Sequence, residues 1–236
     1  MSTNTVSGAE VEKDKIPVTT EAYNIVKDQI VTLKILPGQL LMVQQLSKEY
    51  GISRTPVREA LVRLKEEGLV TAADGRKFQV SYITWKLIKD IYRARQTVEV
   101  SSVANAAAHY CDELGNGLTE VSERMKKSYE QGQYSDYFEA DNGFHELLLE
   151  YLDNEVISNW MGKISDQQQR IRYATMGIST SMQISFNEHM AMIKAIREGD
   201  VEAAKKGMEE HLERALRDIL KLRDQANPYL TAFIQD

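Results

Sequence analysis

The chain has 236 residues, of which 42% are hydrophobic and 27% are charged. This length and composition allow one large domain or two modest ones with real hydrophobic cores. The formal net charge of −6 excludes a uniformly basic nucleic-acid-binding protein. The charge is unevenly spread, because residues 1–80 hold 11 Lys and Arg against 10 Asp and Glu, whereas the rest hold 18 against 25. Any DNA-binding surface must therefore concentrate its cations locally, in the first third of the chain.

Cysteine usage and hydropathy exclude two further classes of protein. The single cysteine, Cys111, rules out an intrachain disulfide and fits a reducing, cytoplasmic environment. Because Cys111 falls in an alanine-rich helical run, we expect a buried and inert thiol. The polar, acidic start does not have the pattern of a signal peptide, and no apolar run approaches the length of a membrane span. We expect residues 1–16 to be a disordered tail and the protein to act without a membrane.

The next two segments have the pattern of a helix followed by a helix-turn-helix. Residues 19–35 are amphipathic, and Leu36-Pro37-Gly38 ends that helix. The stretch 46–70, LSKEYGISRTPVREALVRLKEEGLV, spaces its apolar residues so that two short helices pack together. Gly51 suits the left-handed turn after the first helix, and Ser53 suits the N-cap of the second. The pattern therefore predicts a helix-turn-helix.

The second of these helices carries the expected DNA contacts at its N-terminal end. Arg54, Thr55 and Arg58 project away from the apolar face, and the two arginines lie one turn apart. Such arginines can reach guanine edges in a major groove, while the hydroxyls of Ser53 and Thr55 can bond phosphate.

A hairpin is predicted directly after the recognition helix. Gly68 ends the helix, Leu69–Thr71 and Phe78–Val80 read as strands, and the Asp74-Gly75 pair between them favours a tight turn with Gly75 at its tip. Arg76, beside that tip, can meet phosphate. These features predict the wing of a winged helix; the alternative is an ordinary helical hairpin with solvated charges.

The run SRTPVREAL at residues 53–61, together with Pro37-Gly38, Leu46-Ser47 and Gly68-Leu69, resembles the GntR family of bacterial transcription regulators. The resemblance implies a winged helix-turn-helix DNA-binding domain over residues 17–80. It also implies base contacts for Arg54 and Arg58, phosphate contacts for Ser53 and Thr55, and entry of Gly75 into the minor groove.

The remainder of the chain is predicted to be helical. We expect a linker at residues 81–86, an all-α domain at 87–225 and a C-terminal tail at 226–236. Short loops between the helices favour an antiparallel bundle, so the fold class is mainly α, a winged helix-turn-helix followed by an all-α antiparallel helical bundle. The expected helices cover residues 86–111, 117–131, 134–152, 154–174, 180–198 and 200–223.

Three of the four histidines form a pattern with one aspartate. Asp141 and His145 are four residues apart, which places both on one face of a helix that also carries apolar residues. His189 and His211 flank the turn Gly199-Asp200 at similar distances, so they should sit level on neighbouring antiparallel helices. Such a donor set suits Zn²⁺, Ni²⁺, Mn²⁺ or Fe²⁺. The alternative is that each histidine is a satisfied core residue.

We interpret the other charged residues and the fourth histidine of this region one by one. We expect Glu188 and Glu210 to face solvent and His109 to be structural. Arg95 lies among apolar residues of the first bundle helix, and its charge must be met either by Glu99 or by a ligand carboxylate. Arg172 is a weaker candidate for the same role, and a solvated helix face is the favoured interpretation of it.

Residues 87–220 resemble the FCD effector domain of the FadR subgroup of GntR regulators. The resemblance implies that Asp141, His145, His189 and His211 ligate a divalent metal, most readily zinc, and that an organic acid binds beside it. It also favours a place for Arg95 in the effector cavity. The matching features are Tyr92-Arg93-Ala94-Arg95 with Glu99, Asp141 with His145, Glu188-His189 with Ala195-Ile196, Gly199-Asp200 with Ala203-Ala204, and His211-Leu212.

The sequence thus predicts a metabolite-responsive transcription regulator, most often a repressor in this family. It should bind near-palindromic operator DNA as a homodimer and respond to a small carboxylate. Two alternatives remain open: a metal-dependent hydrolase or lyase that uses the winged helix for docking, and a regulator for which the metal itself is the signal. No general acid or base is evident beside the four ligands, so we do not expect an enzyme.

Overall fold

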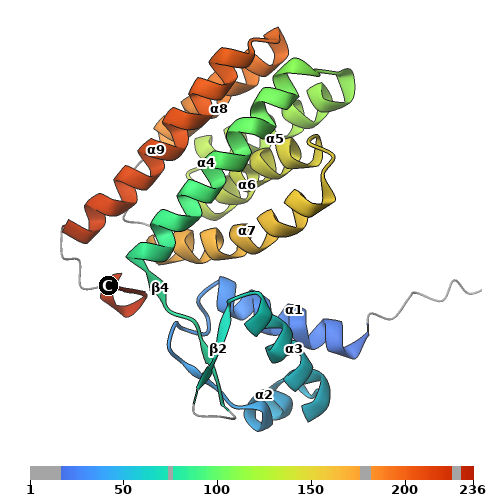
Figure 1. Ribbon diagram of the computed structural model, residues 1–236, viewed down its shortest axis with the longest axis vertical. Coiled ribbons are helices and arrows are strands. Elements are labelled where there is room, and N and C mark those ends of the chain that lie inside the picture. The colour runs from blue at the N-terminus through green and yellow to red at the C-terminus, as the bar shows by residue number, and fades with distance from the viewer. Residues whose placement is uncertain (1–16, 74–76, 176–181, 225–229) are drawn as a thin grey trace, which may run out of the picture. The chain divides into compact units, whose positions relative to one another are not determined.

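A computed structural model describes residues 17–73, 77–175, 182–224 and 230–236 (Figure 1). The chain divides into two compact units, one made of residues up to Asp28 with Leu40–Gln79, and the other of Gln29–Gln39 with Val80–Asp236. The second unit therefore includes a segment, residues 29–39, that the sequence assigned to the DNA-binding domain. We refer to the two units as the winged-helix unit and the helical unit.

The winged-helix unit has the predicted order of helices and strands. A three-stranded sheet has the order β1-β3-β2, and β1 and β3 are antiparallel, with Leu40 opposite Gln79. Gly51 ends α2, the first helix of the helix-turn-helix, with φ +67°, as expected of a left-handed cap. Fully buried apolar side chains such as Val57, Leu61 and Leu64 join the two helices of the motif. The elements are α1 (Val18–Val31), β1 (Leu40–Leu41), α2 (Val43–Tyr50), α3 (Arg54–Glu66), β2 (Val70–Ala73) and β3 (Lys77–Val80).

The helical unit is the predicted bundle. Its helix α4 packs along α9, and α5 packs against α6. One core of aliphatic and aromatic side chains, Phe144 and Leu118 among them, runs through the helices. The helices are α4 (Trp85–Ala108), α5 (Asp112–Glu130), α6 (Tyr134–Glu150), α7 (Glu155–Thr175), α8 (Met182–Glu198) and α9 (Val201–Asp224). None of the described helices is both long and apolar enough to cross a membrane.

The expected linker and tail are more ordered than the sequence suggested. Within residues 81–86 lies strand β4 (Ile83–Thr84), and the last residues form a short 3-10 helix (Leu230–Ala232) and strand β5 (Ile234–Gln235). The two strands pair in parallel, with Ile83 opposite Ile234. Two-residue strands are too short to show a hydrophobic period, so only tertiary contact reveals them. The buried Leu230 and Ile234 explain why the end of the chain folds back.

The carbonyl of Ser81 is also held by a buried arginine. Arg170 of α7 is fully buried, donates to the Ser81 carbonyl oxygen and bonds Gln167 Oε1 at 2.8 Å. Burial lowers the pKa of Arg170 to about 10. The connection that follows Val80 is therefore fixed to the bundle by both α7 and β5.

The environment of Cys111 differs from the expectation of a buried thiol. Helix α4 ends at Ala108, and Cys111 is the exposed N-cap residue of α5. The alanine-rich run stops before the cysteine, so the apolar period does not include it. His109, the C-cap residue of α4, is exposed, and its Nδ1 lies 3.1 Å from the Asn105 carbonyl oxygen.

Shortening a side chain of β5 tests its contribution to stability. Ile234 is 4% exposed, so we expect Ile234→Ala to lower the free energy of unfolding of the helical unit by about 2–4 kcal/mol, through lost burial and a residual cavity. Urea denaturation followed by circular dichroism measures the change. The control is Ile184→Ala, because Ile184 is 51% exposed and its loss should cost less than about 0.5 kcal/mol. Equal effects would contradict a stabilising role for β5.

Candidate metal centre

One face of α6 supplies two of the polar side chains. Tyr137, Asp141 and His145 follow one another at intervals of four residues, so they lie on one side of the helix at successive turns. All three are buried, with Asp141 at 2% and His145 at 5% exposure. The sequence expectation that Asp141 and His145 point inward is met.

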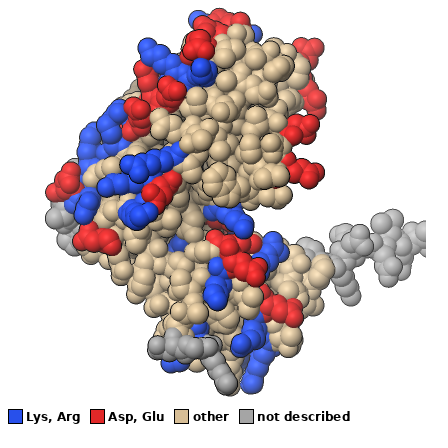
Figure 2. Space-filling view, in the orientation of Figure 1, with Lys and Arg blue, Asp and Glu red and all other residues tan. Residues whose placement is uncertain are grey.

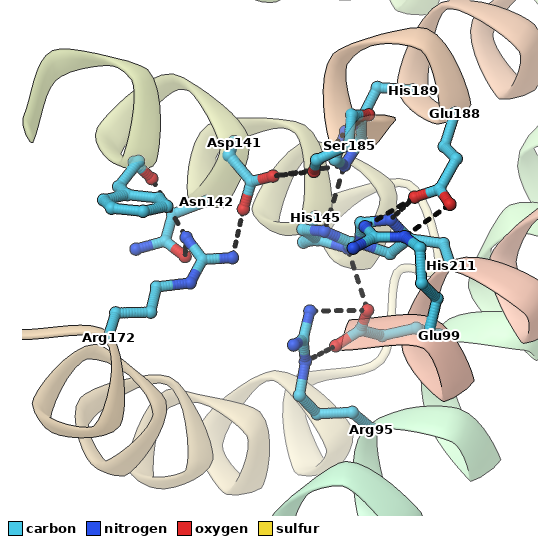
Figure 3. A network of polar contacts seen from close by, with 12 residues as sticks. Arg95, Glu99, Asp141, Asn142, His145, Arg172, Ser185, Glu188, His189 and His211 are labelled. Carbon is cyan, nitrogen blue, oxygen red and sulfur yellow. Dashed lines mark hydrogen bonds and ion pairs between the residues drawn. The ribbon is translucent and has the colours of Figure 1, made fainter. Parts of the chain in front are cut away.

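Helices α8 and α9 bring the other two histidines to the same place. Gly199, with φ +69°, ends α8, and Asp200 caps α9 by accepting a hydrogen bond from the Ala203 backbone N–H at 3.0 Å. Because of this tight turn, His189 and His211 lie side by side on the antiparallel helices α8 and α9, and both are buried. Donor atoms of Asp141, His145, His189 and His211 all lie within 4.8 Å of one another (Figure 3).

Each imidazole has a polar contact at Nδ1, on the side away from the cluster. Nδ1 of His145 lies 2.8 Å from Glu99 Oε2, and Nδ1 of His211 lies 2.8 Å from Glu188 Oε2. Nδ1 of His189 lies 2.7 Å from the Ser185 carbonyl oxygen. The partners of His189 and His211 are acceptors, so in these two rings Nδ1 is the protonated nitrogen and Nε2 carries a free lone pair. Such outer bonds are typical of histidines that ligate metals.

The chemistry of the donor set fits a divalent metal. Burial lowers the pKa of His189 and of His211, so both rings are neutral. Burial raises the pKa of Asp141, but Arg172 and the histidines outweigh it and hold that pKa well below its usual range. Nε2 of His189 and Nε2 of His145 are 3.3 Å apart, so two potential donor atoms for a cation face each other. Two nitrogens bound about 2.0–2.1 Å from a tetrahedral zinc ion have roughly that separation.

Arg95 lies beside the cluster and is paired with Glu99. Its Nε lies 2.6 Å from Glu99 Oε1, and both residues are 2% exposed. Burial raises the pKa of Glu99, but Arg95 and His145 outweigh it and bring that pKa to about 2. Glu99 therefore stays ionised and links the arginine to His145. Of the two expected partners for Arg95, the structure shows Glu99, and Arg95 also lines the adjacent cavity.

The interpretation of Arg172 as a solvated residue was wrong. Its side chain is 14% exposed, donates to the Asp141 carboxylate and bonds Asn142 Oδ1 at 2.9 Å (Figure 3). The C-terminal part of α7 is buried, as Ile171 and Ala174 show, and this packing turns Arg172 toward α6. A helix that is packed on two sides lacks a clear polar face. The amphipathic pattern of α7 therefore did not reveal which way Arg172 points.

The expectation that Glu188 faces solvent was also wrong. Glu188 accepts hydrogen bonds from Arg214 Nε at 2.6 Å and Nη2 at 2.7 Å, besides its contact with His211. The antiparallel packing of α8 on α9 creates these contacts, and sequence spacing does not reveal them. Glu210 is exposed as expected, with Lys206 Nζ at 3.8 Å.

A cavity of about 70 Å³ adjoins the cluster on one side. Three guanidinium groups, those of Arg95, Arg172 and Arg214, reach its wall, although each is also paired with an acid. Arg214 was not singled out from the sequence, because a basic residue on an amphipathic helix usually faces water. The remaining lining residues are Tyr92, Tyr134, Tyr137, Phe138, Asp141, Thr175, Met182, Ser185, His211, Ala215 and Ile219.

The expected DNA-contacting residues of the recognition helix are exposed. Ser53 is the N-cap of α3, without a side-chain cap bond, so its hydroxyl is open to solvent. Arg54, Thr55 and Arg58 are exposed on the first turns, while Pro56 and Val57 are buried. Lysine and arginine side chains gather over α2 and α3 in Figure 2. The predicted wing-tip residues Gly75 and Arg76 lie outside the described residues.

The fold and the buried cluster define a class: a protein with a winged-helix unit, typical of DNA-binding proteins, and an all-helical unit that encloses one carboxylate and three imidazoles. Residues 18–80 match the bacterial regulatory proteins of the gntR family, and residues 90–214 match the FCD domain. The chain therefore belongs to the GntR family of transcription regulators, in the group with an FCD domain, and the FadR subgroup is consistent with this.

Named relatives agree with this assignment. The chain is 25% identical over 215 residues to the HTH-type transcriptional repressor RspR of Escherichia coli, which covers 91% of this chain and 94% of that protein. E. coli McbR/YncC has a similar fold, with a TM-score of 0.77 at 18% identity over 89% of this chain and all of that one. A structure described as the metal-free FCD domain of TM0439 has a TM-score of 0.53 at 21% identity, and covers 61% of this chain and 99% of that one. These relatives are regulators rather than enzymes.

Glu188 and Glu210 form a matched pair, since each precedes a histidine of the cluster. Glu188→Gln removes the charge that orients His211, so we expect zinc affinity to fall about 10- to 100-fold. Competition with a chromophoric chelator measures the affinity. Glu210→Gln changes an exposed acid and should leave zinc affinity unchanged. Equal losses in the two variants would show that Glu188 acts only through overall charge.

Proposed function

We propose that this chain is a transcription regulator, acting as a repressor, whose operator affinity is controlled by a small carboxylate bound beside a divalent metal in the helical unit. One observation carries the proposal: the donor atoms of one carboxylate and three imidazoles all lie within 4.8 Å of one another. Buried charged groups are costly unless they are paired or coordinate a metal, and the four donor atoms are close enough to share one ion. The absence of a candidate span among the described helices fits action in the cytoplasm.

The DNA-binding step is assigned to the exposed end of α3. Arg54 and Arg58 reach base edges in a major groove, Ser53 and Thr55 bond phosphates, and Gly75 with Arg76 contacts the adjacent backbone. One winged helix offers few cations. We therefore propose that a homodimer presents two winged helices to a near-palindromic operator. Affinity should fall as salt rises, because phosphate contacts release counterions.

The metal is assigned to Asp141, His145, His189 and His211. A set of three imidazoles and one carboxylate favours zinc, and nickel, manganese and iron(II) accept the same donors. The bound ion would supply a Lewis-acidic centre for an oxygen ligand. The four protein donors are buried, so we propose that the ion is a permanent part of the site and not the signal.

The effector is assigned to the cavity beside the cluster. Arg95, Arg172 and Arg214 offer guanidinium groups to an anion there. Arg172 at present bonds Asp141, so an incoming carboxylate competes with Asp141 for that guanidinium. Binding can change operator affinity only if the acid prefers one arrangement of the dimer over the other.

Substitution of Arg58 tests the DNA-binding assignment. We expect Arg58→Ala to weaken binding to DNA fragments selected with the wild type by about 10- to 100-fold, the loss of one bidentate base contact. Fluorescence anisotropy measures the affinity, and thermal unfolding should be unchanged because Arg58 is exposed. Lys65→Ala, at the exposed far end of α3, should cost much less. Similar losses at both positions would argue for a purely electrostatic surface.

Removal of a histidine tests the metal and its role. We expect His189→Ala to lose zinc from the purified protein and to lose the rise in melting temperature that zinc gives the wild type. Its operator affinity should no longer respond to small carboxylates such as malate or lactate. His109→Ala removes an exposed histidine and should behave as the wild type in all three measurements.

The alternatives are separated by the same measurements. Full zinc content in His189→Ala would contradict the ligand assignment. If chelation alone changes the operator affinity of the wild type as strongly as any acid, the metal is the signal. If no acid changes operator affinity in the zinc-loaded wild type, carboxylate control is wrong.

A further inference from the structure

Arg170 of α7 is a buried charge without a counter-charge. Its side chain is fully buried, and no carboxylate among the described residues pairs with it, so burial lowers its pKa unopposed. Burial also lowers the pKa of Arg95 and of Arg214, but Glu99 and Glu188 outweigh it there and raise both values. An unpaired buried charge is costly to the fold. Stability therefore does not explain why α7 carries an arginine at this position.

The hydrogen bonds of this guanidinium lead to one segment outside α7. Nη1 donates to Gln167 Oε1 at 2.8 Å, on the same helix, and Nη2 donates to the carbonyl oxygen of Ser81. In the part of the chain that the structure describes, no atom bonds the buried Nε. A charge with so few partners cannot give one up cheaply. Ser81 must therefore follow any displacement of this part of α7.

Ser81 directly follows the wing strand β3. Val80, the last residue of β3, accepts a hydrogen bond from the Gly38 N–H at 2.9 Å and donates to the Gln39 carbonyl oxygen at 3.0 Å. Gln39 in turn precedes β1, which pairs with β3. A displacement of Ser81 therefore acts on the end of β3 and the start of β1.

The same helix reaches the metal cluster through a second arginine. Arg172 donates to the Asp141 carboxylate, bonds Asn142 Oδ1 at 2.9 Å and lines the cavity. Arg170 and Arg172 are two residues apart, so they leave α7 on different sides. One side chain contacts the cluster, and the other contacts Ser81.

We propose that Arg170 is a positioning residue that transmits a displacement of α7, caused by an anion at Arg172, through Ser81 to the winged-helix unit. This inference rests on the proposed carboxylate control and assigns the route of that control. Arg170 is neither a donor of the cluster nor part of the cavity lining, so it acts through Ser81 and not on the ligand. The two ends of α7 contacts move together because both arginines belong to one continuous helix.

The first test is the stability of Arg170→Met, which removes the charge and keeps most of the side-chain volume. We expect a melting temperature within about 5 °C of the wild type, because relief of the unpaired charge offsets the lost hydrogen bonds. Zinc affinity should stay within about twofold, since Arg170 is not a ligand. A much larger drop in melting temperature would mean that Arg170 serves the fold, and would overturn the inference.

The control is Arg197→Met, which makes the same change in net charge. Arg197 is exposed on α8 and donates to Thr119 Oγ1 at 2.7 Å, away from Ser81 and the cluster. It should behave as the wild type in every measurement.

The second test measures coupling in the zinc-loaded full chain. Fluorescence anisotropy gives operator affinity with and without saturating malate or lactate, and the wild type and Arg197→Met should show a change of about fivefold or more. In Arg170→Met the change should fall below about twofold, while calorimetry still detects binding of the acid. Arg170→Lys should keep part of the response, because an ammonium can also donate to the Ser81 carbonyl.

The outcomes separate this inference from the function on which it rests. If Arg170→Met keeps the wild-type response, or if Arg170→Lys loses it as completely as Arg170→Met, the route through Ser81 is wrong and carboxylate control stands. If Arg170→Met no longer binds the acid, Arg170 acts at the cavity, which also overturns the inference. If neither acid changes the operator affinity of the wild type, carboxylate control and the inference fail together.

Discussion

The bonds made by the three Nδ1 atoms set the chemistry of the cluster. His189 and His211 bond the Ser185 carbonyl oxygen and Glu188 through Nδ1, and Nδ1 of His145 lies 2.8 Å from Glu99 Oε2. These contacts hold the three rings so that their Nε2 atoms point toward one place, as metal-binding histidines require. Without these bonds the rings could rotate or exchange tautomers, and three buried imidazoles would merely be core residues.

The acids behind the cluster are themselves held by arginines. Arg95 pairs with Glu99, and Arg214 pairs with Glu188, so two chains of arginine, glutamate and histidine run into the site. The same arginines reach the cavity wall. An anion in the cavity would therefore compete for groups that indirectly orient the histidines. This shared use of the guanidinium groups gives a physical route by which effector and cluster can influence each other.

Helix α7 connects this site to the segment that follows the winged helix in sequence. Arg172 bonds Asp141 of the cluster, while Arg170 bonds the carbonyl of Ser81. Both arginines belong to one helix, so a shift of α7 would be felt at both contacts. The pairing of β4 with β5 holds the same segment from another side. Residues 81–84 are therefore part of the helical unit.

Local sequence determined the winged helix, the positions of the bundle helices and the candidacy of Asp141, His145, His189 and His211. These follow from helical period, from caps such as Gly51 and Asp200, and from residue chemistry, all of which act over a few positions. Tertiary structure alone decided that Arg172 and Glu188 face inward, that β5 pairs with β4 and that Cys111 is exposed. Each of these depends on which helix covers which face, and that is set by contacts between residues far apart in the chain.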